Sequence, residues 1–509
     1  MEADKIGFDS DKYLEEQSRY ILERASKLDG RLYLEFGGKL IFDMHAARCL
    51  PGFDPNAKIK LLERMKNDTE IIICINADAI VRKKIRADFG ITYDYDILRL
   101  IDDLRKRELK VCGVVVTCFR GEHAAVQFME RLKRRSVQVY VHHATEGYPE
   151  NIDMIVSDQG FGVNEYIETS RPVVVVTAPG PGSGKMATCL NQLYHEHARG
   201  QKSGYAKFET FPVWNLPLDH PVNIAYEAAT ADLGDYNVID PFHLEAHAES
   251  AVNYNRDVES FPILKRILER ITGDKSMYSS PTDMGVNRAG YAIIDDAVVR
   301  EAALREIARR VFNYRCEYAQ GLVDIQTVQC AEKIIMRLDI DPDEIHKVVK
   351  PARAALERAM ARHETHDADD IICAAALELP DGRIVTGKNS FLMHASSCLI
   401  LNAVKVLAEI PQELDLLEPS VIESITNMKQ TILRGCQPTL DLEEMLIALS
   451  VSAATSSLAR LGVRQLAKLR GCDVHLTHIA TPGDSAGMRQ LGLQLTCDAR
   501  FAGKNLFEI

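Results

Sequence analysis

Short runs of almost uninterrupted apolar, mostly β-branched residues recur through the first 200 residues of the chain. Residues 70–76, 111–117, 137–141 and 173–177 are of this kind, and helical patterns at 95–107 and 123–134 separate several of them. Strands without polar–apolar alternation are buried on both faces, as in parallel sheets that helices cover on both sides. The sequence therefore predicts an α/β fold in which residues 1–200 form a Rossmann-like, doubly wound, mostly parallel sheet.

A glycine-rich turn follows the last of these strands and leads into a helix. Backbone N–H groups in such a turn can surround an anion, the helix N-terminus adds partial positive charge, and a lysine adds a full one. Pro179 replaces the first glycine of the usual phosphate-binding pattern, and Met186 replaces its Mg²⁺-binding hydroxyl. We predict a P-loop-like phosphate site, with a purely structural turn as the alternative. The cofactor-binding candidates are Gly180, Gly182, Ser183, Gly184 and Lys185.

Asp240, His243 and His247 have the spacing of one helical face. The intervals of three and four residues bring all three side chains together if a helix begins near Pro241. Such a face can bind a divalent metal or supply acid–base groups. In the alternative interpretation, Asp240 caps a polar helix whose histidines are exposed.

Residues 205–290 combine proline, aromatic and polar residues with little periodicity, which is typical of ordered loops near a site. Arg288 and Lys207 are natural partners for an anion. We select Asp240, His243, Asp283 and Arg288 as catalytic candidates. In the alternative interpretation these side chains are hydrogen-bonded braces within the loops.

The domain organisation follows from these patterns and from the polar and proline-containing segments that interrupt them. Residues 1–200 form the first α/β domain, and residues 201–294 continue it as a loop-rich segment that contains the site. Residues 295–366 are helical almost throughout and form a connecting region. A polar run at 363–370 precedes the last α/β domain, residues 367–509.

Charge and composition exclude some classes of partner. The formal net charge is −12 and the pI is about 5.7, which argues against a general nucleic-acid or acidic-membrane surface. No apolar run reaches membrane-spanning length, and the first residues lack a signal sequence. We expect a cytoplasmic protein that forms a homo-oligomer and contacts neither nucleic acid nor membrane.

The segments 177–188, 211–218, 239–246 and 280–287 together resemble one conserved bacterial family of unknown function. The resemblance extends over the whole chain. It implies a cytoplasmic bacterial protein with several α/β domains and no settled activity.

Residues 373–389, followed by a helix that begins near His394, are similar to the start of the cytidine-deaminase fold. In that fold a hairpin turn, here Asp381-Gly382, leads to a helix that opens with a zinc ligand. His394 matches the zinc-ligand position, but Ser396 replaces the catalytic glutamate, and the Pro-Cys-x-x-Cys pair is missing. The resemblance implies a deaminase-like α/β scaffold without deaminase chemistry.

Two functional hypotheses follow. In the first, the chain is a nucleotide-dependent enzyme that binds a small phosphorylated ligand, with ATP or another nucleotide as cofactor and with the question of a divalent metal left open. In the second, it is a non-catalytic metabolite-binding or regulatory protein whose C-terminal domain mediates oligomerisation.

Overall fold

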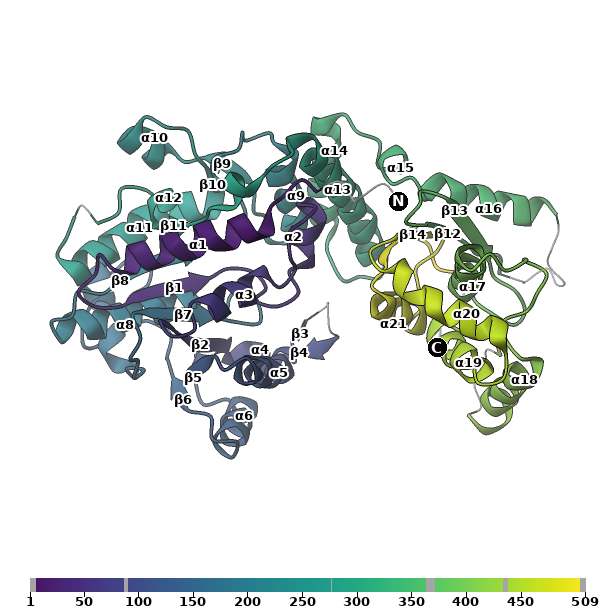
Figure 1. Cartoon of the computed structure of the whole chain (residues 1–509). Coiled ribbons are helices and arrows are strands. Elements are labelled where there is room, and N and C mark those ends of the chain that lie inside the picture. Colours follow the sequence, from purple (N-terminus) through teal and green to yellow (C-terminus); the bar gives the residue numbers. More distant parts are fainter. Residues whose placement is uncertain (1–5, 87–89, 276, 363–370, 434–437, 504–509) are drawn as a thin grey trace. The chain divides into compact units, whose positions relative to one another are not determined.

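The computed structural model describes residues 6–86, 90–275, 277–362, 371–433 and 438–503. The chain divides into two compact units (Figure 1). Residues 5–227 and 235–303 belong to the first, and residues 228–234 and 304–509 belong to the second. The domain boundary that the sequence predicts between residues 366 and 367 lies outside the described residues.

A seven-stranded sheet forms the centre of the first unit, and every strand pair in it is parallel. The predicted mostly parallel sheet is thus confirmed. In spatial order its strands are β11 (Gly285–Val286), β8 (Gly204–Phe208), β1 (Leu32–Phe36), β7 (Val173–Thr177), β2 (Thr69–Asn76), β5 (Lys110–Thr117) and β6 (Val139–Val141).

The central strands are buried on both faces, as their uninterrupted apolar sequences require. All five residues of β7 are buried. On one face Val174 and Val176 join Leu190, Leu193 and Phe261 in a single apolar cluster. Two of these come from α8 (Lys185–Ala198) and one from α11 (Asn255–Thr272). Each fully buried side chain of this size stabilises the fold by about 1.5–3 kcal/mol.

The other helices and small strands of the first unit surround this sheet or continue from it (Figure 1). They are α1 (Ser10–Ala25), α2 (Met44–Cys49), α3 (Ala57–Arg64), α4 (Ala77–Val81), β3 (Ile85–Arg86), β4 (Ile91–Thr92), α5 (Tyr93–Lys106), α6 (His123–Lys133), α7 (Ile152–Ile155), α9 (Pro221–Ala229), β9 (Asn237–Ile239), α10 (Pro241–His247), β10 (Val252–Tyr254) and α12 (Pro281–Met284). α13 (Asp296–Ala319) begins in the first unit, and most of its residues belong to the second.

The second unit contains a four-stranded sheet of order β13-β12-β14-β15. The hairpin β12 (Ala374–Glu378) and β13 (Ile384–Lys388) is antiparallel, β14 (Asp473–Leu476) is antiparallel to β12, and β15 (Gln494–Cys497) is parallel to β14. The helices are α14 (Ile325–Leu338), α15 (Pro342–Ile345), α16 (Val349–Ala361), α17 (Ala395–Leu407), α18 (Pro419–Asn427), α19 (Leu442–Ser452), α20 (Ser457–Gln465) and α21 (Pro482–Leu491).

Within the described part of the chain, no helix is both long enough and apolar enough to cross a bilayer.

Candidate functional site

The glycine-rich turn lies where β7 ends and α8 begins. Gly182 and Gly184 have positive φ angles of 72° and 81°, which only glycine adopts without strain. The helix begins at Lys185, and no side chain within the described residues caps its first turn. Its first backbone N–H groups therefore have no side-chain acceptor.

Side chains from the neighbouring strands hold this turn in place. Thr117, at the end of β5, donates to the carbonyl of Ser183 at 3.0 Å, and Asn76, at the end of β2, donates to the carbonyl of Gly182 at 3.2 Å. A Cβ at Gly184 would lie 2.8 Å from the Thr117 hydroxyl. Part of the glycine pattern thus has a packing cause that does not depend on any ligand.

Thr188 is the hydroxyl residue nearest to the position that Met186 occupies. Its side chain is fully buried and donates to the carbonyl of Gly184 at 3.0 Å. Cys74 of β2 contacts the same hydroxyl at 3.4 Å. Thr188 therefore faces the core and does not offer the missing metal-binding hydroxyl.

A pocket of about 290 Å³ lies at the carboxyl ends of β8 and β11, at the same edge of the sheet as the glycine turn. Three catalytic candidates from the sequence, His243, Asp283 and Arg288, line this pocket, whereas residues 180–185 do not. The lining residues are Tyr20, Lys207, Glu209, Phe211, Pro212, Trp214, His243, Val252, Asn253, Asp257, Pro281, Thr282, Asp283, Gly285, Asn287, Arg288 and Tyr291.

Lys207 forms the centre of a charged cluster in the pocket. Its Nζ lies 2.5 Å from Asp257 Oδ2 and 3.1 Å from Glu209 Oε1. Burial alone would lower the pKa of Lys207, but the charges of Asp257 and Glu209 outweigh it and raise this pKa. The lysine therefore stays charged at neutral pH.

Glu209 has an environment that suits proton transfer. Burial raises its pKa, Lys207 opposes this rise, and the negative charge of Asp257 adds to it, so that the pKa reaches about 7. A carboxyl group with this pKa can both release and accept a proton near neutral pH.

Arg288 is held between two aromatic rings. Its guanidinium carbon lies 4.1 Å from the ring centre of Tyr291 and 4.8 Å from that of Tyr20. Its closest carboxylate, from Glu16, is 3.8 Å away. The buried Nε of Arg288 has no hydrogen-bond partner within the described residues. The side chain is thus oriented in advance and retains donor capacity.

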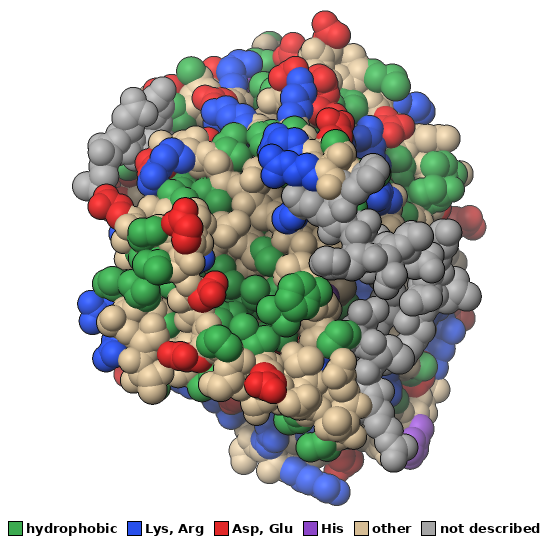
Figure 2. All heavy atoms as spheres, turned by 90° about the vertical axis from the view of Figure 1, so that its right-hand side faces the viewer, with side chains coloured by type: hydrophobic (Ala, Val, Ile, Leu, Met, Phe, Trp, Pro, Cys, Tyr) green, Lys and Arg blue, Asp and Glu red, His purple; other side chains and the backbone are tan. Residues whose placement is uncertain are grey.

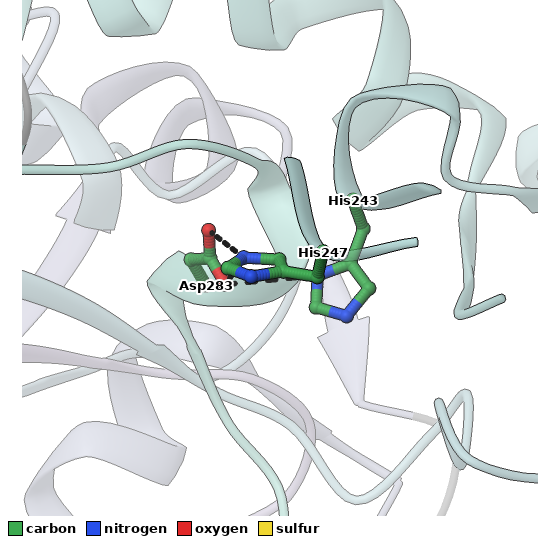
Figure 3. Close-up of side chains that lie close together, drawn as sticks. All are labelled: His243, His247 and Asp283. Carbon is green, nitrogen blue, oxygen red and sulfur yellow. Dashed lines mark hydrogen bonds and ion pairs between the residues drawn. The ribbon is translucent and has the colours of Figure 1, made fainter. Parts of the chain in front are cut away.

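Two histidines and an aspartate meet beside this pocket (Figure 3). His243 and His247 lie one turn apart on α10, and Asp283 comes from α12. His247 Nε2 is 3.0 Å from both carboxylate oxygens of Asp283, and His243 Nδ1 is 3.6 Å from Asp283 Oδ1. His243 Nδ1 also lies 3.2 Å from Ser280 Oγ.

Asp240, the fourth catalytic candidate, contacts the backbone beside the two histidines and Asp283 rather than the pocket. It is fully buried and does not line the pocket. One carboxylate oxygen accepts from the N–H groups of Phe242 and His243 at 3.0 and 3.1 Å. The other accepts from the N–H and hydroxyl of Thr282 at 3.2 and 2.6 Å. Asp240 is thus both the N-cap of α10 and a crosslink to α12.

The family of this chain follows from its matches to known proteins. Models of the domain of unknown function DUF1846, N-terminal and C-terminal, match residues 6–339 and 344–507. The chain belongs to the DUF1846 family. It is 54% identical over 503 residues to a UPF0371 protein of Clostridium tetani, and 54% identical over 504 residues to a UPF0371 protein of Fusobacterium nucleatum. Each match covers 99% of both chains. The whole-chain resemblance to one bacterial family of unknown function is confirmed.

His394 and Ser396, the positions with a deaminase-like pattern, share one buried carboxylate in the second unit. Asp484 lies 2.8 Å from His394 Nδ1 and accepts from the Ser396 hydroxyl at 2.5 Å. Burial by itself would lower the pKa of His394, but the hydrogen bond and charge of Asp484 raise it. Among the described residues, no group of three metal-ligating side chains includes His394. The likeness to the deaminase fold stays a prediction.

Sequence reasoning did not select several important members of the site. Asp257 lies on an amphipathic helix, and Tyr20 resembles a surface residue of α1, so neither has a local sequence signal. Glu209 has a clearer sequence signal than Asp257 or Tyr20, because it directly follows β8. Residues at the carboxyl ends of parallel strands surround ligand sites.

Proposed function

We propose that this protein is an enzyme that binds a phosphorylated small molecule along the carboxyl edge of its seven-stranded sheet. The observation that carries this proposal is the arrangement of that edge. The glycine turn follows β7, the charged pocket adjoins β8 and β11, and only β1 lies between β7 and β8. Two strand spacings amount to about 10 Å, a distance that a sugar phosphate or nucleotide spans.

The glycine turn is the proposed position of the phosphate. β7 and β2 are adjacent in the sheet. From β7 the chain continues to β8, toward one edge of the sheet, and from β2 it continues to β5, toward the opposite edge. Open α/β sheets bind ligands at such a change of direction. Lys185 and the first N–H groups of α8 supply positive charge there. Gly182 is open to solvent, since a Cβ placed on it would meet nothing within 4 Å.

The pocket is the proposed position of the non-phosphate part of the ligand. Trp214, Tyr20 and Tyr291 offer flat apolar surfaces that suit a sugar or a base. Asp257 and Glu209 offer acceptors for hydroxyl groups. At the outer end of the edge, Arg288 supplies a charge that suits a second anionic group.

Glu209 is the group that we expect to transfer a proton during the reaction. Its pKa of about 7 leaves a substantial fraction in each protonation state at neutral pH. Lys207 holds the carboxylate by an ion pair at 3.1 Å and stabilises it once the proton has left.

Binding and turnover of defined ligands test the proposal. Calorimetry with inorganic phosphate, sugar phosphates and nucleotides should find a ligand whose affinity falls at least tenfold in Lys185→Ala. Lys133→Ala, which removes an exposed lysine of α6, is the matched control and should bind normally. Glu209→Gln should retain binding and lose about 10²–10⁴-fold in turnover. Absence of binding by every phosphorylated compound at millimolar concentration would refute the proposal.

The surface of the second unit favours a second candidate function. In it, the protein binds a ligand without catalysis and oligomerises through this C-terminal unit. Figure 2 shows a hollow on one face, bordered in part by apolar side chains. Large apolar side chains of the second unit that are more than half exposed include Phe391, Ile432, Leu433 and Ile447. Binding of a phosphorylated ligand without turnover, together with a dimer that Ile447→Asp dissociates, would favour this candidate.

A further inference from the structure

We infer that His243, His247 and Asp283 bind a divalent transition-metal ion at the wall of the pocket. All three offer one ligand atom within 4.8 Å of the others (Figure 3). The inference does not depend on the phosphorylated ligand proposed above, because none of these residues belongs to the glycine turn.

The distances fit the coordination shell of a small ion. Metal–ligand bonds of about 2.1 Å in a tetrahedral site place neighbouring ligand atoms about 3.4 Å apart. His247 Nε2 lies 3.0 Å from Asp283 Oδ1, and His243 Nδ1 lies 3.6 Å from the same oxygen. The imidazole rings of the two histidines have centres 4.5 Å apart. The three ligand atoms lie within 4.8 Å of one another, so side-chain movements of up to about 1 Å would place them around one ion.

The ligands are supported by hydrogen bonds from buried residues. Asp240 ties the start of α10 to Thr282, the residue before Asp283. Ser280 Oγ accepts from the N–H of Asp283 at 3.0 Å and so holds the start of α12. His243 Nδ1, which lies 3.2 Å from the same oxygen, would exchange that contact for the ion. Supporting groups of this kind fix ligand orientation in metal sites.

The chemistry of the three ligands selects the class of ion. Two imidazoles and one carboxylate suit Zn²⁺, Fe²⁺ or Co²⁺, whereas Mg²⁺ and Ca²⁺ prefer oxygen ligands alone. Three protein ligands leave coordination positions open, as in catalytic sites. Because His243 and Asp283 line the pocket, those positions would face it. The side chain of His247 is 42% exposed, which gives an ion a route from solvent.

Titration of the full-length protein with Co²⁺ and Zn²⁺ after treatment with a chelator tests the inference. One Co²⁺ per chain should bind and give visible d–d absorption, Zn²⁺ should displace it, and a hundredfold excess of Mg²⁺ should not. His247→Ala should weaken Co²⁺ binding at least a hundredfold. His123→Ala, which removes an exposed histidine of α6, should bind Co²⁺ as the natural protein does.

Two further variants separate ligation from loss of folding. Asp283→Asn nearly preserves size and should abolish the Co²⁺ spectrum while circular dichroism stays unchanged. Asp240→Asn alters a positioning residue and should weaken Co²⁺ binding about 10–100-fold. Absence of one tightly bound Co²⁺ per chain, or equal binding by His247→Ala and His123→Ala, would overturn the inference. Phosphate binding that depends on Lys185 would be unaffected by either result.

Discussion

Replacement of Asp240 by alanine should destabilise the first unit far more than a surface substitution does. The carboxylate is fully buried and accepts four hydrogen bonds, two from the start of α10 and two from Thr282. Loss of an N-cap costs about 1 kcal/mol. The partly buried N–H and hydroxyl of Thr282 lose their acceptor as well, and two such hydrogen bonds together contribute about 2–3 kcal/mol. We therefore expect Asp240→Ala to lower the free energy of unfolding by about 3–4 kcal/mol.

Asp240→Asn should cost less, about 1–2 kcal/mol, because the amide oxygen can still cap α10 while the amide nitrogen faces the Thr282 N–H. Urea unfolding followed by fluorescence measures both losses. Trp214 is the only tryptophan of the chain, and its ring lies 6.0 Å from that of His243. The signal therefore reports on the structure around the site.

Glu245→Ala is the matched control, because this acidic residue lies on the same helix and is exposed. It should change the free energy of unfolding by at most about 0.5 kcal/mol. A loss below about 1 kcal/mol for Asp240→Ala would refute the reasoning, since it would mean that neither the cap nor the crosslink contributes as described.

Three other predictions concern separate parts of the molecule. Gly184→Ala should lower the free energy of unfolding by about 2–4 kcal/mol because of its positive φ and its steric overlap, whereas Gly182→Ala, in open space, should lower it by only about 1–2 kcal/mol. Similar losses in urea unfolding would contradict this. The pKa of Glu209 rises from 4.5 to about 7 on folding, so its stabilisation is present below pH 4.5 and is lost as the pH rises to 7. The stability difference between the natural protein and Glu209→Gln should change across this range by up to about 3 kcal/mol, and a constant difference would exclude the raised pKa. Asp484→Ala removes a buried acceptor of four hydrogen bonds and should lower the unfolding midpoint, measured by circular dichroism, much more than Ser396→Ala; equal shifts would contradict the shared-carboxylate arrangement.

The strands of the first unit could be predicted because burial on both faces leaves a local signal. The apolar runs at 111–117 and 173–177 became β5 and β7 almost residue for residue. The order of the strands could not be predicted, since it depends on the crossover connections that place β7 between β1 and β2. β11 has only two residues, too few for any periodic pattern.

The site was predictable where contacts are local and not where they are long-range. The four-residue spacing of His243 and His247 correctly indicated one helical face. The same spacing suggested that Asp240 shares that face, but its carboxylate turns back to cap the helix. Asp283 completes the group from 36 residues beyond His247, a distance at which sequence periodicity gives no information.

The two short helices at the site explain why Asp240 should connect stability with metal binding. α10 has seven residues and α12 has four, and helices of this length are unstable without outside support. The position of Asp283 relative to His247 therefore depends on the Asp240–Thr282 contact rather than on either helix alone. Substitution of Asp240 should weaken the fold and Co²⁺ binding together. Substitution of Lys185, at the other end of the same sheet edge, should affect neither, so the comparison distinguishes a supported metal site from a general loss of structure.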